Sequence, residues 1–377
     1  MKRTVIALLT ASAGLTGLGL VMLATWQYAQ LHGGCECTEV SNVLAEQMVG
    51  AAVGWFLLWT VSHVDYRYWE KVALPFFAMV LVLLFGNWIP SIGLDPSPHR
   101  MISIDVLAHV QPAVIAGWSG ILFLAWWYGA RRPSNLGWVP FAALGGLMMV
   151  LLAYPNFGAV LWLLLAGAPV MILGKAGRGY VILFVICVMN GIIWIITQSP
   201  SRIWRLAALL SAESLREGPR SISKIALESR GWTDVGLASG NWTIGGFPMT
   251  AGNWTAAHIG EVLGVPGLLA ITGLYLTVLV SGGLIAVKAR WGFGRLLGTG
   301  IVSLTGASII LNLATLAAPG YITPPALPFV SNSGLGLCMN LLAVGILVSI
   351  ARNIDKRDLK FKDFPVAQLP PRRSRQG

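Results

Sequence analysis

Charged residues are scarce in this chain and make up only 11% of its 377 residues. A soluble domain of this length needs a polar surface, and so few charges cannot supply one. The hydrophobic residues, 55% of the chain, gather in runs of roughly 17–25 residues, the length that crosses a bilayer as a helix. The shortage of charge therefore excludes an ordinary soluble protein, and the sequence predicts a helical membrane protein.

Cysteine is also scarce, with four residues in the chain. Cys187 and Cys338 fall inside predicted membrane spans, where we expect them to act as packing residues. Cys35 and Cys37 follow His32 closely in a predicted loop, and imidazole and thiolates are soft metal ligands. A structural zinc site usually needs four ligands, so a redox-sensitive pair, or no role, stays open beside a metal site.

Apolar runs and turn residues together predict an all-α, polytopic membrane bundle of about ten transmembrane helices. We expect this domain to occupy residues 1–351, with a large outer loop at about 198–255, and a basic, disordered tail to occupy 352–377. The predicted spans are residues 5–28, 46–63, 71–89, 108–130, 138–153, 157–173, 179–197, 257–287, 295–317 and 333–351.

Positive charge is distributed unevenly over the predicted connections. The formal net charge is +11, and 19 of the 26 Lys and Arg residues fall on one side of the predicted membrane. This is the positive-inside pattern, which places that side and both termini in the cytoplasm. We therefore attribute the basic charge to topology and to anionic membrane lipids, and we expect no nucleic-acid partner.

The predicted outer loop opens with a segment that has arginines between apolar residues. Arg202 and Arg205 flank Trp204, and this spacing is typical of a short amphipathic helix that lies at the membrane surface. The two arginines could bind a lipid pyrophosphate, or their charged ends could extend to lipid headgroups, and the sequence leaves both alternatives open.

Seven motifs, spread over nearly the whole chain, resemble those of one protein family. They are Val61–Trp69; Gln111-Pro112 after Arg100; Pro155–Ala159; Pro200–Leu206; Ser229–Leu237, continuing to Pro248; Ile259–Gly264; and Asn312 with Leu327–Ser331. Their order along the chain and their positions relative to the predicted spans resemble those of the SEDS family of bacterial peptidoglycan polymerases and their cell-division and cell-shape relatives.

The resemblance implies a location and a reaction. SEDS proteins are multi-pass proteins of the bacterial cytoplasmic membrane, and on its outer face they polymerise lipid II, the lipid-linked disaccharide-pentapeptide, into glycan strands. They work with a class B penicillin-binding protein that cross-links the product. Lipid II and such a protein are therefore the partners that we expect for this chain.

The chain departs from the family at several charged positions. Asn253 aligns with the essential family Asp, and Met249 aligns with a Glu in the same motif. Val114 and Gly117 stand where the family has a Glu and a Lys. Asparagine cannot take a proton near neutral pH, so Asn253 is expected to be impaired as a catalytic residue. Asp234 in the outer loop is the candidate for a substitute base.

The resemblance suggests further substrate-binding candidates besides Arg202 and Arg205. They are Arg100, Glu261, Asn312 and Ser331. Glu261 and Asn312 have structural alternatives, because an acid in a membrane span needs a partner and an amide in a span often bonds between helices. No cofactor or bound metal is expected, with a divalent cation left open.

Three functions remain open on the sequence alone. The first is an active lipid II glycosyltransferase, which the family architecture favours. The second is a catalytically degenerate scaffold or regulator that binds the lipid precursor or a penicillin-binding protein, which the lost charges favour. The third is a lipid II translocator, which no particular residue supports.

Overall fold

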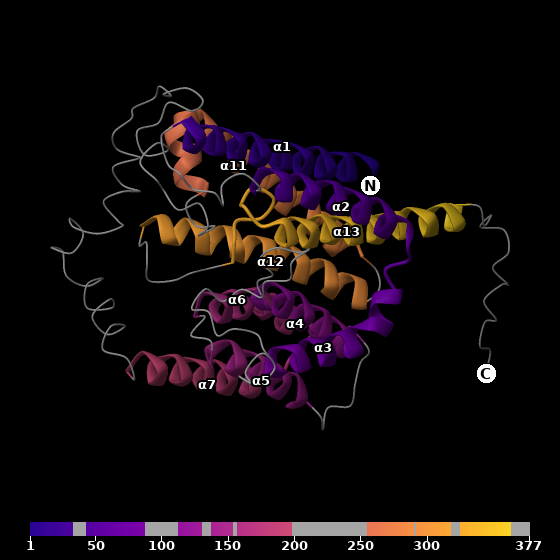
Figure 1. The fold of residues 1–377 in the computed structure, drawn as a ribbon. Helices are drawn as coiled ribbons and strands as arrows, with labels where there is room; N and C mark the ends of the chain where they lie inside the picture. The colour runs from indigo at the N-terminus through magenta and orange to yellow at the C-terminus, as the bar shows by residue number, and fades with distance from the viewer. Residues whose placement is uncertain are drawn as a thin grey trace, which may run out of the picture.

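The computed structural model describes residues 1–32, 43–86, 112–129, 137–153, 157–197, 255–289, 292–317 and 325–362. These residues form ten α-helices and no strand (Figure 1). The helices are α1 (Lys2–His32), α2 (Val43–His63), α3 (Tyr68–Gly86), α4 (Pro112–Gly129), α5 (Val139–Ala153), α6 (Phe157–Leu173), α7 (Arg178–Thr197), α11 (Thr255–Lys288), α12 (Gly292–Ala317) and α13 (Gly334–Lys362).

Each helix corresponds to one predicted span, so the all-α bundle is confirmed. Six helices are long and apolar enough to cross a membrane: α1, α2, α3, α11, α12 and α13. The other four, α4 to α7, contain shorter apolar stretches among the described residues. The predicted spans agree with the observed helices because turn residues such as Gly and Pro interrupt the apolar runs close to the helix ends.

The last helix differs from the prediction, because α13 continues to Lys362 instead of ending at 351. The added residues, 352–362, are mostly charged and contain no Gly or Pro, a composition that tolerates a helix outside the membrane. The first part of the segment expected as a disordered tail is therefore helical, and the rest lies outside the described residues.

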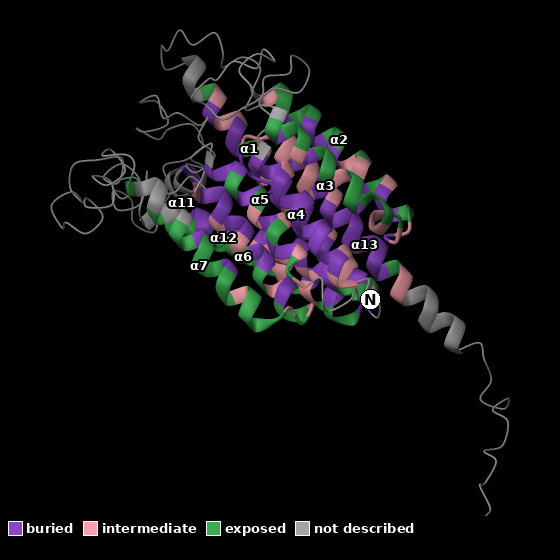
Figure 2. Cartoon of the chain, turned by 90° about the horizontal axis from the view of Figure 1, so that it is seen from below, coloured by how far each residue is buried: buried purple, intermediate pink, exposed green. Residues whose placement is uncertain are grey.

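Helix α12 occupies the middle of the bundle (Figure 1). It packs against α4 and α6 on one side and against α11 on the other, while α13 forms its most extensive contact with α2. The buried side chains of these helices join into one large apolar core. Figure 2 shows buried positions through the centre of the bundle and exposed positions along its edges. The exposed side chains are largely apolar, as expected for helices that face lipid.

Helix α11 contains a break at Gly264, whose backbone angles are φ 63° and ψ −159°. Residues other than glycine rarely adopt these backbone angles, so the glycine at this position permits the kink. Pro266 follows it and removes a backbone donor, which also disfavours a straight helix. The kink divides α11 into a short first part, which contains Glu261, and a long second part.

Candidate functional site

A non-helical segment, residues 325–333, leads into α13 inside the protein. Most of it is buried, including Leu327, Phe329 and Ser331. Non-helical backbone is tolerated at membrane depth only against protein or a water-filled cavity. The structure places it against protein, because α1 approaches so closely that a Cβ at Gly19 would lie 2.8 Å from the Val330 Cα.

Three side chains from three different helices hold this segment through its carbonyl groups. Asn312 on α12 donates from Nδ2 to the Pro325 carbonyl at 2.9 Å. Tyr275 on α11 donates to the Pro328 carbonyl at 2.6 Å, and Gln47 on α2 donates from Nε2 to the Ser331 carbonyl at 3.1 Å. Buried carbonyls need such partners because no helix supplies them here, so the three side chains position the segment.

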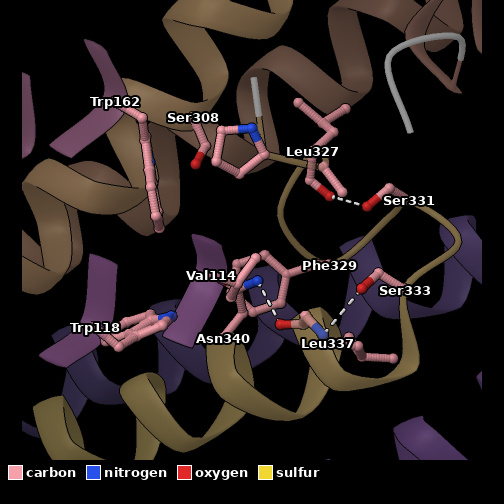
Figure 3. Close-up of a pocket in the computed structure, with 13 residues that line it drawn as sticks. Val114, Trp118, Trp162, Ser308, Leu327, Phe329, Ser331, Ser333, Leu337 and Asn340 are labelled. Atoms are coloured by element: carbon pink, nitrogen blue, oxygen red, sulfur yellow. Dashed lines mark hydrogen bonds between the residues drawn. The ribbon is translucent and has the colours of Figure 1, made fainter. Parts of the chain in front are cut away.

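Phe329 lies at the centre of the segment with φ 66°, an uncommon value for a residue with a side chain. Its ring lies toward Val114 and Asn340 (Figure 3). Close by, the Ser331 hydroxyl donates to the Leu327 carbonyl at 2.7 Å and closes a turn. The strained conformation persists because hydrogen bonds on both sides hold the backbone in place.

A small cavity lies between this segment and helices α4, α6, α12 and α13 (Figure 3). Trp118, Trp162 and Phe329 give it aromatic walls, and Ser308 and Ser331 supply hydroxyl groups. The volume of this cavity is only about 20 Å³. That is room for a water molecule or two, and a sugar or a pyrophosphate would not fit without movement of the walls.

Trp162 closes this cavity on the side of α4. Its Nε1 donates to the Leu304 carbonyl on α12 at 2.9 Å, which holds the buried indole between two helices. A Cβ at Gly117 would come within 2.5 Å of the ring carbon Cη2. The ring therefore occupies the space into which any side chain at position 117 would extend, and Val114 borders the same cavity with an apolar side chain.

The structure places only some of the predicted site residues. Asn312 and Ser331 lie near the cavity, and Asn312 also donates to the Ser308 carbonyl at 2.8 Å. Glu261 belongs to the first part of α11, but its side chain is not among those described. The five remaining candidates lie outside the described residues: Arg100, Arg202, Arg205, Asp234 and Asn253.

Sequence reasoning missed Trp162, Tyr275 and Gln47. Gln47 gave a signal that could have been used, because an amide inside an apolar span needs a hydrogen-bond partner. Trp162 gave none, since a tryptophan among leucines is equally typical of a lipid-facing position.

The described residues hold no group of three or more His, Cys, Asp or Glu side chains that could bind a metal ion. Of the cysteines, Cys187 is exposed on α7, while Cys338 lies 3.1 Å from the Gly50 carbonyl through its Sγ. Cys35 and Cys37 lie outside the described residues, so their metal and redox alternatives stay predictions.

Among the described residues, ten apolar helices, six of them long enough to cross a membrane, surround a buried non-helical segment, and this arrangement defines a polytopic helical membrane protein. A sequence model for the FtsW, RodA and SpoVE proteins, described as "Cell cycle protein", matches residues 6–356. The chain therefore belongs to this family, the SEDS family.

The relatives are distant but align over most of their length. The chain is 27% identical to a probable peptidoglycan glycosyltransferase FtsW of Trichlorobacter lovleyi, covering 95% of this chain and 96% of the relative. It is 25% identical to the stage V sporulation protein E of Bacillus subtilis, covering 81% and 86% respectively.

Solved structures share the fold at lower identity. A chain of a peptidoglycan synthase complex, solved to describe the coordination of polymerization and crosslinking, has a TM-score of 0.68 at 18% identity. The match covers 92% of this chain and 97% of the other. The rod shape determining protein RodA of Thermus thermophilus has a TM-score of 0.59 at 18% identity, covering 92% and 96% respectively.

Proposed function

We propose that this chain serves peptidoglycan assembly, in cell division or cell-shape control, by binding lipid II and a class B penicillin-binding protein. In this proposal it has little or no glycan polymerase activity of its own. The main support for the proposal is the contact of Trp162 with Gly117, because this contact leaves no room for the lysine that the family has at position 117. The asparagine at position 253, where the family has its essential Asp, supports it independently.

Glycosyl transfer needs a group that takes the proton from the attacking hydroxyl and a charge that stabilises the departing pyrophosphate. Asn253 has an amide that can donate and accept hydrogen bonds but cannot act as a base near neutral pH. Val114 and Gly117 provide no charge beside the cavity. The chain has thus lost several charged groups together, as expected if catalysis is no longer maintained.

Binding of the precursor rests on other residues. Arg202 and Arg205 can each offer a planar guanidinium to a pyrophosphate, which is a strong, charge-assisted contact. Replacing both with Gln is expected to weaken lipid II binding by about 1–3 kcal/mol. Replacing both with Lys tests the geometry, because lysine keeps the charge but lacks the guanidinium. Unchanged affinity in the double Gln variant would favour contact with lipid headgroups instead.

The second candidate is an active lipid II polymerase, favoured by the family match over residues 6–356. In that case another acid must act as the base, and Asp234 is the residue to test, because it stands in the outer loop where the family usually has glycine. Its carboxylate would need to lie within hydrogen-bond reach of the attacking hydroxyl. Asp234→Asn would then abolish polymerisation, whereas Asp65→Asn, in the connection between α2 and α3 that the charge pattern predicts to be cytoplasmic, would not.

One experiment separates the two candidates. The purified protein is incubated with lipid II, alone and with its cognate penicillin-binding protein, and the glycan products are separated by length. An FtsW protein from a relative, assayed beside it, shows that the substrate and conditions work. Our proposal expects bound lipid II without glycan strands. Strands formed at the rate of the relative would contradict it and move attention to Asp234.

A further inference from the structure

Helix α7 lies at the edge of the bundle beside α5 (Figures 1 and 2). Phe184 and Val188 are its buried side chains among those described, and the Phe184 ring lies 5.7 Å from the Phe141 ring of α5. The opposite face carries large exposed apolar side chains, including Ile182, Ile186 and Ile193. Apolar side chains on that face are what a bilayer requires and need no other partner.

Asn190 interrupts this apolar face. It follows Ile186 by four residues and precedes Ile193 by three, so it lies on the same side of the helix, away from α5. Its side chain is exposed, and Nδ2 donates to the Ile186 carbonyl at 2.8 Å. Among the described residues, this is the only hydrogen bond that the Asn190 side chain makes. One N–H and the amide oxygen therefore have no partner among the described residues.

Asn190 is far enough from both ends of α7 that it would lie at hydrocarbon depth in a bilayer crossed by this helix. With a rise of about 1.5 Å per residue, Asn190 stands about 18 Å from Arg178 and about 10 Å from Thr197. An amide carbonyl and an N–H left without partners in hydrocarbon are costly. Exposed threonines of other helices avoid this cost, because the hydroxyls of Thr60 and Thr277 each donate to a carbonyl of their own helix.

We infer that α7 is the contact surface for a second copy of this chain, with Asn190 hydrogen-bonded to Asn190 of the second copy. Two copies inserted in the same orientation are related by an axis along the membrane normal, so identical residues meet at the same depth. An amide is both donor and acceptor and therefore complements itself. Asparagine bonds between helices are a recognised means of association in membranes, and the isoleucines on either side supply the packing.

Disulfide crosslinking in native membranes tests this contact. The four natural cysteines are replaced by serine, and Ile186→Cys or Ile193→Cys is added, because both positions flank Asn190 on the proposed surface. Val280→Cys on α11, which is 59% exposed, serves as the matched control for a lipid-facing position. Two differently tagged copies are expressed together, and mild oxidation is followed by purification on one tag. A disulfide needs Cα atoms within about 7 Å, so only residues at a close contact are captured.

The expected result is a dimer that contains both tags for Ile186→Cys and Ile193→Cys, and at least tenfold less for Val280→Cys. Adding Asn190→Leu is expected to reduce the dimer at least tenfold, while Asn190→Gln, which keeps the amide, retains most of it. Leucine on a lipid-facing surface should not disturb folding, and elution of each variant as a single species in size exclusion verifies this. Absence of a dimer carrying both tags, or a dimer insensitive to Asn190→Leu, would overturn the inference. Capture of a different protein would overturn it as well.

Discussion

The indole ring of Trp162 lies over the point where a side chain of residue 117 would begin, and glycine is the residue that fits there. This contact joins α6 to α4 beside the small cavity. It makes Gly117 a residue that packing requires in this chain, whereas the resemblance associates the same position with a lysine.

A methyl group at position 117 should therefore destabilise the protein. We expect Gly117→Ala to cost about 1–3 kcal/mol, because the added atom forces either the ring or the helix to move. The apparent melting temperature in detergent measures the effect. Gly273→Ala on α11 is the matched control, since a Cβ there meets no atom within 4 Å. Equal melting of the two variants would mean that the ring moves aside freely.

The hydrogen bond from Tyr275 to the Pro328 carbonyl should contribute to the same stability. Tyr275→Phe leaves a buried carbonyl without its donor, for which we expect a loss of about 1–3 kcal/mol. Thermal unfolding measures the difference. Tyr180→Phe provides the comparison, because the Tyr180 side chain is 43% exposed and its ring contact with Phe141 needs no hydroxyl. A Tyr275→Phe variant as stable as Tyr180→Phe would show that the 325–333 segment is held by packing alone.

Restoring the family carboxylate should not restore polymerase activity. Asn253→Asp alone is expected to raise lipid II polymerisation less than tenfold, although a well-placed base contributes about 10²–10⁴-fold. The reason is that the apolar Val114 and Gly117 remain beside the cavity, and a lysine at position 117 would collide with Trp162. Glycan products measure the gain, and Asn253→Gln controls for a simple change of side chain. Recovery to the rate of an active relative would show that Asn253 alone limits the reaction.

The proposed site requires the outer loop to face away from the cytoplasm. From the charge asymmetry, we expect reporters fused after residues 33, 95 and 225 to lie on the outer side. Reporters after residues 133, 177 and 360 should lie in the cytoplasm. Two reporters are fused at each position, one active only in the cytoplasm and one active only outside it, and their activities show on which side the position lies. A cytoplasmic signal after residue 225 would place the predicted lipid II contacts on the wrong face.

The helices could be predicted from the sequence because the apolar runs and the residues between them mark each span directly. The membrane span was predicted to end at residue 351, and α13 continues beyond it to Lys362, because charged residues end a membrane span without ending the helix. Asn312 was a substrate-binding candidate with an interhelical hydrogen bond as the structural alternative, and in the structure its Nδ2 donates to the Pro325 carbonyl in a non-helical segment.

The cavity could not be predicted in the same way. Trp162 and Gly117 are 45 positions apart in the chain, and neither residue type signals their contact. The loss of family charges at 114 and 117 could be noted in the sequence, but only the structure reveals that an aromatic ring fills the space. For Arg202, Arg205, Asp234 and Asn253, which lie outside the described residues, the predictions stand as made.

The extensive contact of α2 with α13 has a consequence for biosynthesis. A Cβ at Gly50 would lie 2.7 Å from the Gly334 Cα, and one at Gly345 would lie 2.9 Å from the Leu58 carbonyl oxygen, so the two backbones approach closely. Helix α2 leaves the ribosome early, but its partner α13 is made about 290 residues later in the chain. Until then, Gln47 lacks the carbonyl of Ser331, and the glycine-rich face of α2 must stay covered by lipid or by an insertion factor. Premature termination before α13 should therefore leave α2 without the helix that it contacts most, which makes the truncated chain a substrate for membrane quality control.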